Sequence, residues 1–179
     1  MTVRSRIFSA SGAVSPALGS ALSLGLRVAF ALSLLPFFLA SVATQIDGFM
    51  LTDQAYFLIL PQYMEAVAYD PAQISWPGHL YVALGTLAEA VLPVLLVLGL
   101  ATRAAALGMV LFIVVMSVTD IWFHGVPDAV VGALLDPDPY ALILDQRLIW
   151  CALLSALAVV GGGRVSFDAL IGRFRPASR

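Results

Sequence analysis

Apolar residues form four long stretches along the chain, separated by connections that carry most of the charges. The stretches are Leu18–Thr44, Leu80–Leu100, Ala104–Phe123 and Tyr140–Val160. Each reaches roughly the 20 residues that a helix needs to cross about 30 Å of hydrocarbon. The pattern predicts an all-α fold, a bundle of four transmembrane helices, with segment 45–79 as its largest connection.

The charges of the connections are sorted by sign, which predicts the orientation of the bundle. The first and third connections carry only acidic residues: Asp47, Asp53, Glu65, Asp70, Asp128, Asp136 and Asp138. The basic residues outside the stretches are Arg4, Arg6, Arg103, Arg164, Arg173, Arg175 and Arg179. Because cytoplasmic segments are enriched in Arg and Lys, we expect both termini in the cytoplasm and segment 45–79 outside.

Composition supports a membrane protein with a single domain over residues 1–179. Hydrophobic residues make up 61% of the chain and charged residues only 11%, against about 25% charged in soluble domains. The basic face suits an anionic lipid surface better than nucleic acid, so the lipid bilayer is the expected partner. The single cysteine, Cys151, excludes an internal disulfide or a dithiol relay within the chain.

The N-terminal stretch has two interpretations. Arg4, Arg6 and Arg27 precede the apolar segment 28–40, and Ser41-Val42-Ala43 resembles the cleavage site of a secretory signal. The apolar stretch begins before Arg27, however, and is too long for a signal core. We therefore expect a retained first helix, with cleavage as the alternative, and we expect Arg27 to extend to the lipid headgroups.

Two features of the connection 45–79 predict short helices. Asp53 is expected to cap a helix over residues 54–60 through its carboxylate, which can accept from free amides of a first turn. Pro61 then allows a second helix over residues 62–69.

Ionisable residues inside the stretches are the candidate functional groups, because each is costly in the membrane unless it faces the bundle interior. At about 1.5 Å per residue, Glu89 lies roughly 13 Å and Arg147 about 10 Å below the outer surface. Asp120 and His124 end the third stretch near that surface and are four residues apart, on one helical face. We predict a Glu89–Arg147 pair at the centre of a polar pocket, flanked by Asp120 and His124, or alternatively a purely structural clamp.

Two motifs resemble the DoxX family of bacterial membrane proteins. The segment Gly99-Leu100-Ala101-Thr102-Arg103, downstream of Glu89, resembles one family landmark, and Gly161-Gly162-Gly163-Arg164-Val165-Ser166-Phe167-Asp168 resembles the closing pattern of the family. Arg27 stands where the family carries an arginine opening its first span. Two departures are the lack of a Gly-x-x-Lys in segment 37–44 and the long first connection.

The resemblance implies a four-helix subunit in the bacterial cytoplasmic (inner) membrane, often linked to redox enzymes. Some relatives are named for thiosulfate:quinone oxidoreduction, and others accompany thiol- or metal-stress proteins. Three functions stay open: an accessory or anchoring subunit of a redox or stress-protection complex, a quinone- or small-solute-binding subunit, and a small-molecule transporter. The sequence shows no motif of an autonomous enzyme and no metal site, and it does not identify catalytic residues. A subunit of a quinone-linked oxidoreductase stays open, with a quinone as the candidate cofactor.

Overall fold

The described part of the protein is mostly helical, and it contains four helices that are long and apolar enough to cross a membrane. The computed structural model describes residues 15–174, so the predictions made for Arg4, Arg6, Arg175 and Arg179 lie outside the described part. The four helices are α1 (Pro16–Ser33), α5 (Trp76–Leu98), α6 (Thr102–Thr119) continued by η2 (Asp120–His124), and η3 (Leu142–Arg147) continued by α8 (Leu148–Val160). The hydrophobic pattern therefore gave the right type and approximate position of the four apolar helices.

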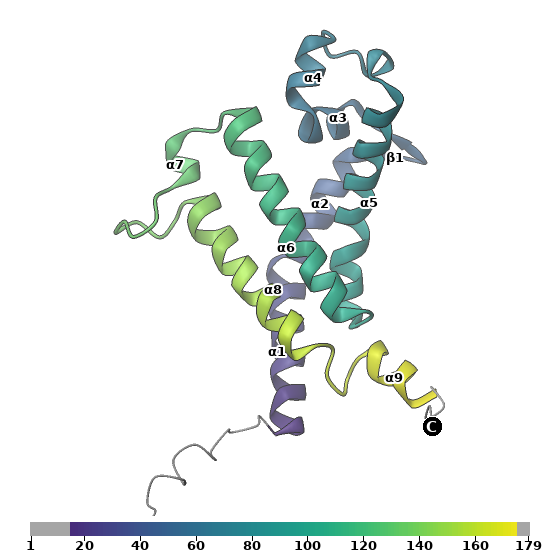
Figure 1. The fold of residues 1–179 in the computed structure, drawn as a ribbon, viewed down its shortest axis with the longest axis vertical. Helices are drawn as coiled ribbons and strands as arrows, with labels where there is room; N and C mark the ends of the chain where they lie inside the picture. The colour runs from purple at the N-terminus through teal and green to yellow at the C-terminus, as the bar shows by residue number, and fades with distance from the viewer. Residues whose placement is uncertain (1–14, 175–179) are drawn as a thin grey trace, which may run out of the picture.

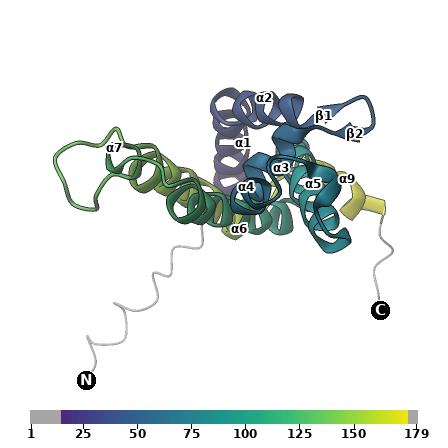
Figure 2. The same ribbon diagram turned by 90° about the horizontal axis from the view of Figure 1, so that it is seen from above.

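The first apolar stretch is broken, where a single helix was predicted. Helix α1 ends at Ser33, and α2 (Leu35–Gln45) begins after Leu34, in a changed direction (Figure 2). Pro36 explains the break, because its ring nitrogen carries no hydrogen to donate to the preceding turn. Helix α2 instead uses Pro36 in its first turn, where no amide donor is needed.

The main hydrophobic core lies where α1, α2, α5, α6 and α8 meet. Helix α6 packs against both α5 and α8, and the fully buried residues include Phe30, Phe38, Leu96 and Met109. Phe30 and Phe38 stack across the break with ring centroids 6.4 Å apart, which holds α1 and α2 together. Leucines and valines on the outward faces are exposed, as expected of helices whose surroundings are lipid.

The connection 45–79 folds into a cap at the end of the bundle where α5 and α6 are furthest apart (Figure 1). It contains the antiparallel pair β1 (Ile46–Asp47) and β2 (Met50–Leu51), then α3 (Asp53–Ile59), α4 (Pro61–Ala66) and η1 (Pro71–Gln73). A second core cluster of Ala55, Tyr56, Met64, Ile74 and Val82 joins the cap to α5. On the far side of α6, the connection to η3 contains the short α7 (Asp128–Val131).

Two details of the cap differ from the prediction. Asp53 is the first residue of α3 rather than its cap: Thr52 occupies the capping position, and no side chain caps the helix. A carboxylate in a first turn is still favourable because it faces the positive end of the helix dipole. The second short helix, α4, begins at Pro61, one residue before the predicted start, and ends at Ala66, short of residue 69.

The opposite end of the bundle is held together by Arg27, and the prediction that Arg27 extends to the lipid headgroups is wrong. Arg27 is only 7% exposed. Its guanidinium donates to the carbonyls of Leu96 and Val97 at the end of α5, and to those of Gly162 and Val165 after α8. The last carbonyls of a helix have no partners within the helix, so Arg27 satisfies them and ties two chain segments together instead of extending to the membrane surface.

Asp168 makes the complementary contact at the same end, from the first turn of α9 (Phe167–Phe174). Its carboxylate accepts from the amides of Ala101 and Thr102 and from the Thr102 hydroxyl, and so caps the N-terminus of α6. Burial acts to raise the pKa of Asp168, but these hydrogen bonds and the charge of Arg27 outweigh it and lower the pKa below its usual value. Ala101, with a left-handed φ of 48°, forms the tight turn between α5 and α6.

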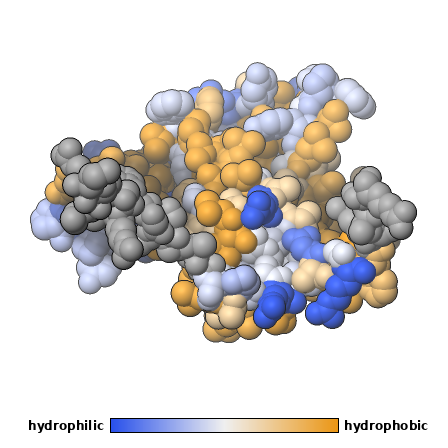
Figure 3. All heavy atoms as spheres, turned by 60° about the horizontal axis from the view of Figure 1, so that its bottom comes forward, coloured by the Kyte–Doolittle hydropathy of each residue, from blue (hydrophilic) through white to orange (hydrophobic). Residues whose placement is uncertain are grey.

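The surface at this end is mixed. Hydrophilic residues gather on one part of it beside apolar areas (Figure 3), and among the described residues Arg103, Arg164 and Arg173 are exposed basic residues of this end. The acidic connections lie at the cap end, so the sorting of charges along the sequence corresponds to two poles of the folded bundle.

Candidate functional site

A cavity of about 780 Å³ lies in the half of the bundle nearest the cap. Helices α5 and α6 diverge from the turn that joins them toward the cap (Figure 1), and the space between them is lined by α2, α5 and α6. Leu58 and Ile59 of α3 also line it, so the cap contributes to the wall. Most of the lining is apolar, and the acidic and basic residues on it are Glu89, Asp120 and Arg147.

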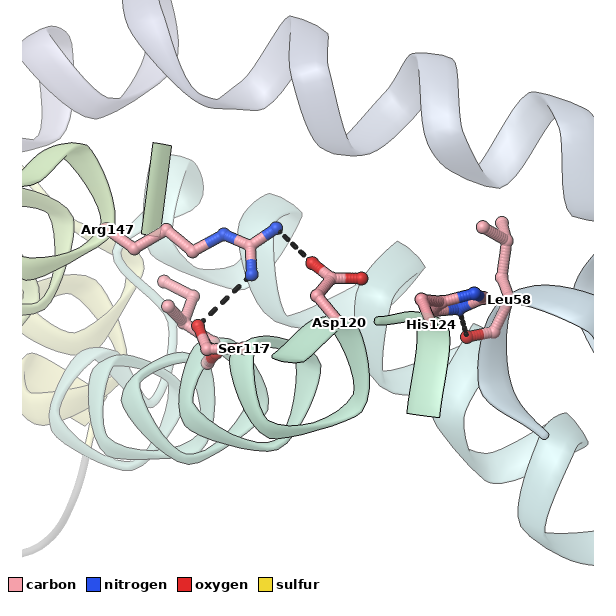
Figure 4. A network of polar contacts seen from close by, with 6 residues as sticks. Leu58, Ser117, Asp120, His124 and Arg147 are labelled. Atoms are coloured by element: carbon pink, nitrogen blue, oxygen red, sulfur yellow. Dashed lines mark hydrogen bonds and ion pairs between the residues drawn. The ribbon is translucent and has the colours of Figure 1, made fainter. Parts of the chain in front are cut away.

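Arg147 binds Asp120, and not Glu89 as predicted. Its Nη2 donates to Asp120 Oδ2 at 2.6 Å, and its Nη1 donates to Ser117 Oγ at 3.1 Å (Figure 4). Helix α6 packs directly against α8, so the arginine at the start of α8 meets side chains of α6. Glu89, on α5, lies on the same cavity wall without forming the ion pair.

Glu89 is held by a neutral side chain, that of Gln45, the last residue of α2. Gln45 Nε2 donates to Glu89 Oε2 at 2.7 Å and also to Ser41 Oγ, while its Oε1 accepts from Thr86 Oγ1 at 2.7 Å. Gln45, Thr86 and Glu89 are all at least 95% buried. This chain of hydrogen bonds fixes the position of the carboxylate in the cavity wall.

Sequence reasoning missed the polar residues that hold Glu89. A signal for Thr86 was present, because it lies three residues before Glu89 and therefore on the same face of α5. Gln45 carried a weaker signal, since a glutamine at the end of an apolar stretch usually marks only the boundary of a membrane span.

Both members of the ion pair lie in π-helical turns. Asp120 begins η2, and Arg147 ends η3. Such turns are rare in proteins and occur frequently at functional sites, because the wider turn displaces side chains from the regular helical positions. Arg147 Nε is also buried and has no hydrogen-bond partner among residues 15–174. The guanidinium therefore keeps donor capacity that the fold does not use.

The two histidines hold the cap rather than line the cavity. His124 Nε2 contacts the Leu58 carbonyl at 3.1 Å (Figure 4), and its ring packs against Phe57. His79 Nδ1 contacts the Tyr56 hydroxyl at 2.7 Å. Both interactions fasten α3, which lies over the space between α5 and α6 in the view from above (Figure 2). His124, predicted beside Asp120, is thus adjacent to the cavity but outside its wall.

Comparison of the chain with protein-family models, with curated proteins and with solved structures finds no match. The resemblance to DoxX proteins therefore rests on the sequence motifs alone. In the structure, both motifs lie at the end of the bundle opposite the cap. Arg27 and Asp168 join the turn Gly99–Ala101 to the segment 161–168 there. Their residues stabilise the fold, and the cavity is built from other parts of the chain.

Proposed function

We propose that this chain is a DoxX-like subunit of the bacterial inner membrane that holds a small amphiphilic molecule in the cavity beside Glu89 and Arg147. In this proposal it acts as an accessory or anchoring subunit of a redox or stress-protection complex, with its basic end in the cytoplasm. The single observation that carries the proposal is the cavity itself, an apolar space of about 780 Å³ with ionisable groups on its wall.

The size and the lining of the cavity support ligand binding. Pockets for small molecules commonly measure about 300–1,000 Å³ and combine apolar walls with a few polar groups that orient the ligand. Ionisable residues within membrane helices are costly, and they usually mark a site that the protein uses. Glu89 and the Asp120–Arg147 pair meet this description, because all three residues line the cavity and none of them belongs to the hydrophobic core cluster.

A quinone is one candidate ligand, and the side chains present fit its head group. Arg147 Nε–H has no partner among residues 15–174 and would suit a carbonyl oxygen, and the Glu89 carboxylate suits a hydroxyl. A bound quinone would supply the two-electron chemistry that this chain does not contain. The residues of the chain would orient the ring, and the apolar wall formed by Leu92, Phe112 and Met116 would exclude water.

The accessory role is supported by the composition of the chain. Its one cysteine, Cys151, has no second thiol with which to form a dithiol couple. A partner protein would then carry out the chemistry, and the chain would retain the ligand and anchor the partner at the membrane.

Purification of the full chain in a mild detergent, followed by mass spectrometry of extracted small molecules and associated proteins, tests the proposal. Ala88 lines the cavity, whereas Ala83 is exposed on the same helix. We expect an amphiphile to co-purify with the wild type and with Ala83→Phe, but to be lost from Ala88→Phe, whose ring fills the cavity. Equal retention by both variants would contradict the cavity as the binding site, and the absence of any oxidoreductase or stress-related protein would contradict the accessory role.

A further inference from the structure

The cavity wall carries one acidic group that no basic group neutralises, and this imbalance bears on the charge of the ligand. The acidic and basic groups on the wall are the carboxylates of Glu89 and Asp120 and the guanidinium of Arg147. Arg147 is paired with Asp120 at 2.6 Å. Glu89 receives the neutral amide of Gln45, and in the described part of the chain no basic side chain lies within ion-pair distance of it.

We infer that the cavity binds a hydrophobic organic cation and that Glu89 holds its positive charge. This inference rests on the proposed function, because it names the ligand class of the same cavity. A carboxylate in a membrane helix is costly unless it meets an opposite charge, and a bound cation supplies that charge. An anionic ligand would gain little from Arg147, which is already neutralised by Asp120, and would be repelled by Glu89.

Aromatic side chains on the wall favour the same class of ligand. Phe37 of α2, Tyr81 of α5 and Phe112 of α6 all line the cavity. The face of an aromatic ring attracts a cation, and the attraction is stronger where water is excluded. The rings also provide apolar contact for the body of the ligand. A hydrophobic cation therefore uses both properties of the wall, whereas a small hydrated ion uses neither the rings nor the apolar surface.

The cavity is accessible to molecules dissolved in the membrane. Leu84 and Leu111 line it and are 57% and 64% exposed, and Val115 on the next turn of α6 is 41% exposed. These residues lie on the apolar outer surface of the helices, which faces lipid in a membrane. A ligand that partitions into the bilayer can thus reach Glu89 from the side, without crossing the cap.

Calorimetric titration of the full chain in a non-ionic detergent tests this inference with two ions of nearly the same shape, tetraphenylphosphonium and tetraphenylborate. We expect the wild type to bind the cation about tenfold or more tightly than the anion, and Glu89→Gln to lose about tenfold of its affinity for the cation. Asp128→Asn is the matched control, because it removes an exposed acid at the same end of the bundle. This control should bind the cation as the wild type does.

Equal affinity of the wild type for the two ions would overturn the inference, and this comparison does not require that any variant folds. Unchanged cation binding by Glu89→Gln would also overturn it. Decylubiquinone, a neutral amphiphile titrated in parallel, separates the inference from the proposed function. Binding of the neutral probe without preference for the cation means that only the assigned ligand charge is wrong. Failure of all three probes to bind contradicts the proposed function as well.

Discussion

Arg147 donates to Asp120 across the contact between α8 and α6, with 2.6 Å between Nη2 and Oδ2. The arginine side chain is 6% exposed and the aspartate side chain 24% exposed. Glu89, whose depth in the membrane had suggested it as the partner of Arg147, is bound by Gln45 instead. The cavity wall thus holds two separate polar groups, one an ion pair and the other a carboxylate supported by neutral side chains.

Removal of either member of the ion pair should destabilise the protein. Breaking a buried pair typically costs about 3–5 kcal/mol because the remaining charge is stranded, and we expect the lower part of this range because Asp120 is partly exposed. Asp120→Ala and Arg147→Ala should therefore each lower the melting temperature in detergent. The double variant Asp120→Asn with Arg147→Gln should recover part of the loss.

Two comparisons make this prediction specific. Asp128→Ala, at an exposed position of α7, should leave the melting temperature unchanged. Adding Glu89→Gln to Arg147→Gln should recover less stability than adding Asp120→Asn does, because Glu89 is not bonded to Arg147. The opposite order of recovery would show that Arg147 is paired with Glu89 after all.

Gln45 should matter for stability although it is neutral. Gln45→Ala removes the partners of Glu89 and Thr86 together, and hydrogen bonds between membrane helices are worth about 1–2 kcal/mol in model systems. Gln45→Glu should be more harmful, because it places a second carboxylate against Glu89. Thermal denaturation in detergent measures both effects, with the exposed Thr44→Ala as the control. A Gln45→Glu variant as stable as the wild type would be inconsistent with the observed contact.

The Asp168 cap predicts a loss of stability at low pH. Because the pKa of Asp168 in the folded protein lies below its ordinary value of 3.8, its stabilisation is fully present above the pKa of the unfolded chain. It is lost as the pH falls through the lower pKa of the folded state. Asp168→Asn should thus melt at a lower temperature than the wild type at neutral pH, and the difference should shrink in strong acid. A constant difference from neutral to acidic pH would show that the charge of Asp168 does not contribute.

The helices could be predicted from the sequence, but the contacts between them could not. Twenty-residue apolar stretches have few alternatives in a membrane, because a helix satisfies its own backbone hydrogen bonds. Depth along a helix also follows from residue number, and it brought Glu89 and Arg147 to the same cavity. It says nothing about which helices are neighbours, and the position of α6 beside α8 decided that Arg147 binds Asp120.

Arg27 shows the same limit at the other end of the bundle. Its place near the end of a span fits an arginine that reaches the headgroups, and the sequence alone favours that interpretation. The carbonyls of Leu96 and Val97 at the end of α5 are brought to it only by the packing of α1 against α5. The break between α1 and α2 could have been predicted from the sequence, unlike the contacts of Arg27. It depends on Pro36, whose effect on a helix is local.

Topology is the prediction that bears most directly on the proposed function, since an accessory subunit must present the correct end to its partner. The exposed Arg103 and Arg164 lie at one pole, and the acidic connections lie at the other. The excess of arginine marks the cytoplasmic side. A reporter that is active only in the cytoplasm should therefore be active when fused at Thr102 or at the C-terminus. A reporter that is active only outside should be active when fused at Asp70. Replacing Arg103 and Arg164 with glutamine should weaken this orientation, whereas Asp136→Asn should not, because acidic residues contribute little to it. An external signal from the Thr102 fusion would place the cap in the cytoplasm and reverse the side from which a partner reaches each pole.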